Sequence, residues 1–75
     1  MPKNKYNIGD IVYYVSKSNK GEITVIKGIV DAIEITARYI KYIVVHNIVY
    51  SLYVSEEYLY DNVTNVMDKV YQLLK

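Results

Sequence analysis

Side-chain character alternates with a period of two through residues 39–54, and this pattern constrains the fold more than any other feature of the chain. A period of two places successive side chains on opposite faces of a β-strand. The odd-numbered set contains the polar residues Lys41 and Ser51, which mark this set as the face toward water. We therefore expect two strands joined by a tight turn at His46-Asn47, with the other set in the core: Ile40, Tyr42, Val44, Ile48, Tyr50, Leu52 and Val54.

Three further strands are expected, because β-branched and aromatic residues dominate the chain ahead of its last quarter. The first covers residues 11–16. The second covers residues 22–35, and Gly28 within it predicts a bulge or a sharp bend. A single helical turn at residues 55–57 precedes a brief last strand at residues 58–60, which would close a small barrel.

The end of the chain changes from a period of two to a helical period. Residues 62–75 are expected to form an α-helix with one apolar face, and Asp61 is a suitable N-cap. A helix of this length is marginal in water by itself, so we expect it to pack on an open end of the barrel. The alternative is a helix that binds a second copy or another protein. The apolar face comprises Val63, Val66, Met67, Val70, Leu73 and Leu74.

Composition limits the class of protein. The 75 residues are 52% hydrophobic with a net charge of +1, which indicates one small folded domain, residues 1–75, rather than a disordered tail or a strongly basic nucleic-acid binder. Because cysteine is absent, a disulfide framework and a thiolate zinc site are excluded. No apolar stretch has the length of a membrane span, and no signal-peptide pattern follows the charged start, so we expect a cytoplasmic protein without membrane contact.

Tyrosine supplies all the aromatic character of the chain, with ten tyrosines and no phenylalanine or tryptophan. The core must therefore take its aromatic bulk from a side chain whose hydroxyl needs a hydrogen-bond partner. Two explanations of this bias stay open. An AT-rich coding sequence favours tyrosine, and so does selection for a binding surface.

No constellation of residues predicts catalysis. His46 is the only histidine and lies in an expected turn, where a solvated residue is favoured over a general base. The neighbours Glu56 and Glu57 point in different directions on one turn, which favours solvated carboxylates over a metal or acid–base pair. The three glycines are too dispersed for a phosphate-binding loop. We therefore expect no enzyme activity, no metal site and no cofactor.

Four segments together resemble the SH3-like barrel of Tudor, KOW and related modules: Ile8-Gly9-Asp10-Ile11-Val12, Gly28-Ile29-Val30-Asp31-Ala32-Ile33, Tyr42-Ile43-Val44 and Val54-Ser55-Glu56-Glu57-Tyr58-Leu59. With Val12-Tyr13-Tyr14-Val15 and the C-terminal helix, the chain is similar to small SH3-like proteins of bacteriophages and mobile elements in low-GC Gram-positive bacteria. The resemblance implies a mainly β fold, with a five-stranded SH3-like barrel over residues 6–60 and one C-terminal α-helix packed on it. Its motifs specify a barrel rather than a ligand.

By analogy, the resemblance also implies a function. A phage or mobile-element accessory protein would bind and inhibit a host factor, for example an antiviral defence component. Tyrosines that project from the outer strand faces are the candidate contacts, with two acidic residues that steer a basic partner: Tyr13, Tyr39, Tyr53, Glu56 and Glu57. A homodimer would cover the same apolar surface. A methyl-lysine cage built from the three tyrosines is a minor alternative, because no spacing makes them converge.

A small nucleic-acid-binding barrel is the alternative function. Residues 1–27 hold five lysines against two acidic residues, and small barrels stack bases on aromatic rings beside basic groups. So few lysines predict only weak and salt-sensitive binding, and an ordinary solvated lysine face is favoured. The candidate contacts are Lys3, Lys5, Tyr6, Lys17 and Lys20.

Overall fold

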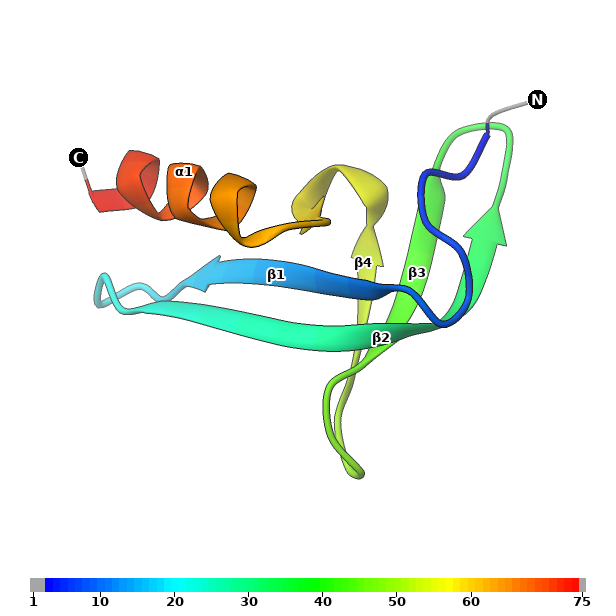
Figure 1. Cartoon of the computed structure of the whole chain (residues 1–75), viewed down its shortest axis with the longest axis horizontal. Coiled ribbons are helices and arrows are strands. Elements are labelled where there is room, and N and C mark those ends of the chain that lie inside the picture. Colours follow the sequence, from blue (N-terminus) through cyan, green and yellow to red (C-terminus); the bar gives the residue numbers. More distant parts are fainter. Residues whose placement is uncertain (1–2, 75) are drawn as a thin grey trace.

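The structure, a computed structural model, describes residues 3–74 and is mainly β. Five antiparallel strands form one sheet in the order β4-β3-β2-β1-β5, and a single α-helix follows at the C-terminal end (Figure 1). Within residues 3–74 the sheet is open, with β4 and β5 as its outermost strands. The elements are β1 (Ile11–Lys17), β2 (Ile23–Ile35), β3 (Ile40–Val45), β4 (Ser51–Ser55), the 3-10 turn η1 (Glu56–Tyr58), β5 (Leu59–Tyr60) and α1 (Val63–Leu74).

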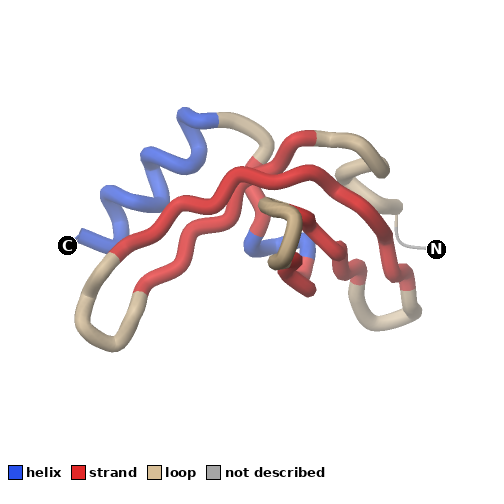
Figure 2. Tube along the Cα trace, turned by 90° about the horizontal axis from the view of Figure 1, so that it is seen from below, coloured by secondary structure: helices blue, strands red, loops and turns tan. Residues whose placement is uncertain are grey.

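The long strand β2 joins the two parts of the sheet. Its first half pairs with β1 from Ile23 to Ile29, and its second half pairs with β3 from Ile29 to Ile35. The β1–β2 hairpin therefore runs across the direction of the β3–β4 hairpin (Figure 1), and the strands follow an arch (Figure 2).

Gly28 allows β2 to approach β3 closely at this junction. A Cβ atom at Gly28 would lie 2.5 Å from Cγ1 of Val44 and 2.9 Å from the carbonyl oxygen of Val45, which is closer than real Cβ contacts. The register shift that we expected at Gly28 lies instead between Val30 and Ala32. Gly28 is therefore required for close packing, whereas the bulge is a separate feature of the β2–β3 pair.

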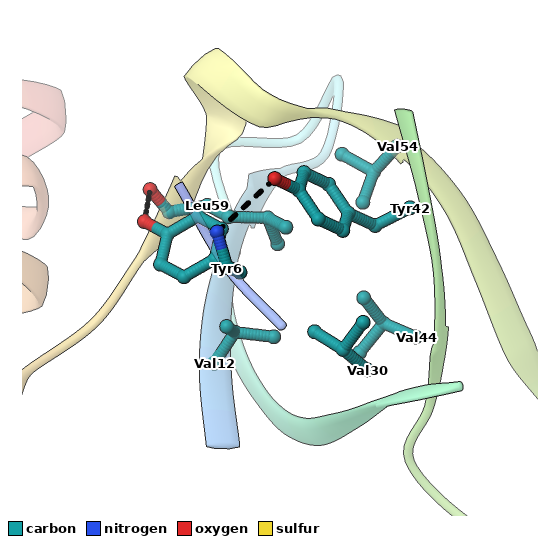
Figure 3. Close-up of a cluster of buried hydrophobic side chains, with 7 residues drawn as sticks. All are labelled: Tyr6, Val12, Val30, Tyr42, Val44, Val54 and Leu59. Atoms are coloured by element: carbon teal, nitrogen blue, oxygen red, sulfur yellow. Dashed lines mark hydrogen bonds between the residues drawn. The ribbon is translucent and has the colours of Figure 1, made fainter. Parts of the chain in front are cut away.

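The core is one cluster of seven buried side chains beneath this junction (Figure 3). The predicted alternation is confirmed at Tyr42, Val44 and Val54, which are buried, whereas their neighbours Ile43 and Tyr53 are exposed. The cluster consists of Tyr6, Val12, Val30, Tyr42, Val44, Val54 and Leu59.

Tyr6 and Tyr42 provide the aromatic part of this core, and their hydroxyls are hydrogen-bonded. The rings pack edge to face with centroids 5.5 Å apart. The Tyr6 hydroxyl donates to the carbonyl oxygen of Leu59, and the Tyr42 hydroxyl accepts from the Tyr6 backbone N–H (Figure 3). The Tyr42 hydroxyl also donates to Glu56. Burial, followed by the negative charge of Asp61, raises the pKa of Tyr6 to about 12, and burial with the hydrogen bond to Glu56 raises the pKa of Tyr42 to about 12.

The β3–β4 connection differs from the expected two-residue turn. β4 begins only at Ser51, so the prediction that Ile48 and Tyr50 face the core is wrong, and both side chains are exposed. Oδ1 of Asn47 accepts hydrogen bonds of 2.8 Å from the backbone N–H groups of Val49 and Tyr50. This side chain closes a local turn that competes with strand pairing, which lengthens the loop.

The helix α1 forms as predicted but starts and packs differently. Asn62 rather than Asp61 is the N-cap, because Oδ1 of Asn62 accepts from the backbone N–H of Asn65 at 2.9 Å. The helix lies along β1 (Figures 1 and 2) and buries Val66, while Val70 and Leu73 are half-buried. The rest of the expected apolar face is exposed at Val63, Met67 and Leu74, and Lys75 lies outside the described residues. Within residues 3–74, no helix has the length and apolar character to cross a membrane.

Candidate functional site

Two of the tyrosines that we expected at a binding surface meet on the outer face of the sheet. Tyr39 and Tyr53 both contact the ammonium group of Lys41, whose Nζ is 4.6 Å from the Tyr39 ring centroid and 4.9 Å from the Tyr53 ring centroid. The Tyr53 hydroxyl also donates a hydrogen bond to Glu34, which lies directly opposite Lys41 in the β2–β3 register. We refer to Glu34, Tyr39, Lys41 and Tyr53 as the Tyr39–Tyr53 cluster. Its cation–π contacts and hydrogen bond hold both rings in place.

The charges of this cluster are stabilised by its hydroxyl groups. The hydrogen bond from Tyr53, then that from Tyr39, lowers the pKa of the Glu34 carboxyl. The same hydrogen bond to Glu34 raises the pKa of Tyr53. Glu34 is therefore ionised and Tyr53 is protonated at neutral pH, so that the hydroxyl–carboxylate contact is maintained there.

Apolar side chains extend the cluster along the outer face of the sheet. Ile43 pairs directly with Tyr53 across β3 and β4, and their side chains are 38% and 56% exposed. A second cross-strand row follows, in which Ile11, Ile29 and Val45 stand opposite one another on β1, β2 and β3, all of them exposed. We refer to Ile43, Tyr53 and this row as the outer sheet face. Exposed apolar side chains that adjoin one another in this way are typical of an interaction surface.

A groove of about 750 Å³ adjoins the cluster at Tyr39. It lies between the 36–39 turn, η1 and α1, and its lining carries charges of both signs. Three of the five residues that we expected to bind protein line it, namely Tyr39, Glu56 and Glu57. The charged residues that complete the lining are Lys5, Arg38, Asp68 and Lys69.

Glu56 and Tyr13 have structural contacts that set them apart from the other expected contacts. Oε2 of Glu56 accepts hydrogen bonds from the Tyr42 hydroxyl and from the Lys5 backbone N–H, so this carboxylate ties η1 to the core and to the N-terminal segment. Tyr13 is half-buried in β1 between Lys27 of β2 and Tyr60 of β5. Glu57, in contrast, is exposed.

The residues expected to bind nucleic acid do not gather at one place. The N-terminal segment and the β1–β2 turn lie at opposite ends of the molecule (Figures 1 and 2), which separates Lys3 and Lys5 from Lys17 and Lys20. Nζ of Lys17 donates to the carbonyl oxygen of Leu73 at the end of α1. Tyr6 is only 3% exposed, which leaves its ring no open face on which a base could stack. Burial in the core is the reason.

Several residues of the site escaped the sequence analysis. Lys41 was interpreted only as a marker of the wet face, although its spacing of two from Tyr39 placed both on that face. The helix α1 contributes three further polar residues that the helical spacing of three and four could have placed beside Asp68, the acidic residue already expected at the rim of a binding surface: Asn65, Lys69 and Gln72.

Groups able to hold a metal ion do not occur among residues 3–74, since no three His, Asp or Glu side chains converge there. His46, the single histidine, instead stacks on Tyr50 with ring centroids 6.1 Å apart. Comparison of the chain with protein-family models, with curated proteins and with solved structures finds no match.

Proposed function

We propose that this chain is a non-enzymatic protein-binding module that uses the outer sheet face together with the adjoining Tyr39–Tyr53 cluster. The observation that carries the proposal is that two exposed tyrosine rings both contact the Lys41 ammonium group, beside the exposed Ile43. Tyrosine is enriched among the residues that dominate binding energy. Rings that are already fixed lose less conformational entropy when a partner binds.

The groove gives this surface a polar extension. Tyr39 belongs both to the cluster and to the groove, so a partner segment that covers the rings continues onto Glu57 and Asp68 on one side and Arg38 on the other. Such mixed charges contribute more to orientation and to the rate of association than to affinity. The partner that fits is a protein with an apolar anchor for the sheet face and charged residues beside it.

The resemblance to small SH3-like proteins supplies the biological setting of the proposal. The strand order β4-β3-β2-β1-β5 and the 3-10 turn ahead of β5 support an SH3-like arrangement, in which β2 is shared between two halves of a barrel. On this basis the chain acts in the bacterial cytoplasm as an accessory protein of a phage or mobile element, and it binds and inhibits a host factor such as an antiviral defence component.

The proposal is tested by capture with matched tyrosine variants. Tagged full-length protein is mixed with lysate of a low-GC Gram-positive bacterium, with and without nuclease treatment, and bound proteins are quantified by mass spectrometry. A partner of this surface is retained by the unchanged chain and by Tyr58→Ala, which alters an exposed tyrosine of η1. The same partner is lost with Tyr53→Ala and with Ile43→Glu, by about tenfold or more.

Two results would contradict the proposal. Retention of every protein by all four forms would show that the outer sheet face is not the contact surface. Loss of all bound material after nuclease treatment would instead favour the nucleic-acid alternative. Circular dichroism of each variant checks that the fold is unchanged.

A further inference from the structure

The first half of β2 has one side of its backbone without a strand partner. Ile23 to Ile29 pair with β1, and pairing with β3 begins only at Ile29, so within residues 3–74 no strand adjoins Ile23–Lys27 on the other side. Three side chains of this stretch, those of Thr24, Val25 and Lys27, are exposed. A strand edge of this kind is a template for a further strand.

Two hydrogen bonds at the ends of the hairpin show which backbone groups are unpaired. The Ser18 N–H donates to the Glu22 carbonyl oxygen at 2.8 Å, and the Val30 N–H donates to the Asp10 carbonyl oxygen at 2.9 Å. Even-numbered residues of β2 therefore direct their backbone groups toward β1. Because these directions alternate in an antiparallel pair, the N–H and C=O groups of Ile23, Val25 and Lys27 point away from β1, toward the open edge.

We infer that the Ile23–Lys27 edge of β2 binds the same edge of a second copy of this chain, antiparallel and with the two-fold axis at Val25. This homodimer goes beyond the proposed function, since it uses another surface and another partner. In this register the two Val25 residues exchange both backbone hydrogen bonds, and Ile23 of each copy exchanges both with Lys27 of the other. The unpaired groups of the three residues are thereby satisfied in both copies.

The charges along the edge favour self-pairing in this register. Lys27 of one copy stands opposite Ile23 of the other, so that no charge faces a like charge. Val15 is the β1 partner of Val25, so four valines then form one cross-strand row through both copies.

The edges at the two outermost strands are less suited to such pairing, and β5 has only two residues. β4 has five residues, and two of the three that alternate outward with Tyr53 are serines, Ser51 and Ser55. Short polar edge strands are a common protection against edge-to-edge association. The β2 edge is β-branched except for Lys27 and carries no proline or bulge between Ile23 and Ile29. The strand propensities therefore favour β2 as the dimer edge.

Sedimentation velocity of the full chain over a range of concentrations tests the inference. A reversible dimer is expected, and a monomer at every concentration up to the millimolar range would overturn it. Val25→Glu and Val25→Lys each place like charges at the two-fold axis and should raise the dimer dissociation constant by about tenfold. An equimolar mixture of the two variants should restore dimer as a heterodimer, and failure of the mixture to do so would reject this register.

A proline and a matched charge control complete the test. Val25→Pro removes an N–H that points to the open edge and not to β1, so the monomer keeps its fold while the dimer is lost. Ile43→Glu adds the same charge to a strand that is paired on both sides, and it should leave the dimer unchanged. Equal weakening by Ile43→Glu and Val25→Glu would overturn the assignment. Since Ile43→Glu affects partner capture and Val25→Glu affects dimerisation, failure of either hypothesis is seen separately.

Discussion

The two ends of this molecule are held together by different amounts of packing. At the junction where β2 passes from pairing with β1 to pairing with β3, seven buried side chains form one cluster, and both buried tyrosine hydroxyls have hydrogen-bond partners (Figure 3). Along the β1–β2 hairpin, α1 covers β1 but completely buries only Val66. Stability is therefore concentrated at the β2–β3 junction around Gly28, while the hairpin and helix leave apolar side chains and a backbone edge accessible.

The difference explains where the two proposed binding surfaces lie on so small a chain. The Tyr39–Tyr53 cluster lies on the outer face of β2, β3 and β4, and the inner face of these strands carries the buried core. Its rings are therefore held on a rigid support. The open edge of β2 lies on the hairpin, where packing on one side only leaves backbone groups unpaired. A rigid display suits an aromatic contact surface, and an unpaired edge suits strand addition.

Of the substitutions considered, Gly28→Val should lower the stability most, because it acts at the β2–β3 junction. The added side chain begins 2.5 Å from Val44 and 2.9 Å from the backbone of Val45, and the backbone cannot move without separating β2 from β3. We expect a loss of about 3 kcal/mol or more in the free energy of unfolding, with a melting temperature lower by roughly 15 °C. Thermal unfolding by circular dichroism measures this. Thr24→Val, exposed on the same strand, is the control and should change the stability by less than about 0.5 kcal/mol. A melting temperature of Gly28→Val equal to that of the unchanged chain would show that the close approach of β2 and β3 does not depend on glycine.

Tyr42→Phe should have the next largest effect. It keeps the ring and removes the hydroxyl that donates to Glu56 and accepts from the Tyr6 N–H, so that a buried donor is left without its partner. We expect a loss of about 2 kcal/mol in urea unfolding. Tyr58→Phe, at an exposed ring, should be neutral. Equal stability of the two variants would show that the Tyr42 hydroxyl contributes nothing.

The sequence predicted the core better than the connections, because a period of two depends on neighbours in the chain. Tyr42, Val44 and Val54 were assigned to the core from alternation alone, and the structure confirms them. The same rule failed at Ile48 and Tyr50, where the Asn47 side chain hydrogen-bonds to the backbone and forms a turn in place of strand pairing. Alternation describes a strand but does not show where the strand begins.

The candidate site could be predicted only residue by residue. Tyr39 and Tyr53 were identified as candidates, but their convergence depends on Lys41 and on Glu34. Glu34 reaches its place through the β2–β3 register, which shifts between Val30 and Ala32. Such a shift leaves no spacing in the sequence from which the cluster could be deduced.

Val66→Ala measures how much the packing of α1 on the hairpin contributes to stability. Val66 is the one fully buried side chain of α1 within residues 3–74, and loss of two methyl groups there should lower the free energy of unfolding by about 1.5 kcal/mol. Met67→Ala removes a larger but exposed side chain, and the change should stay below about 0.5 kcal/mol. Chemical unfolding of both variants measures the difference. A larger loss for Met67→Ala would mean that α1 packs through its other face.

The smallest expected effect is the loss of unfolding free energy at alkaline pH, which depends on the two buried tyrosines of the core. The pKa of Tyr6 and that of Tyr42 are both about 12 in the folded chain, against 10.0 for an unperturbed tyrosine. The unfolded chain therefore releases these protons at lower pH, so the stability that they contribute is complete below about pH 10 and is lost as the pH rises through about 12. Tyr42→Phe removes one of the two groups and keeps Tyr53, whose pKa is also raised. Between about pH 9 and about pH 11, the unchanged chain should lose about 1 kcal/mol more than Tyr42→Phe, measured from urea midpoints at each pH. Parallel losses in the two proteins would mean that the Tyr42 proton is released as readily in the folded as in the unfolded chain, and that its hydrogen bond to Glu56 does not hold it.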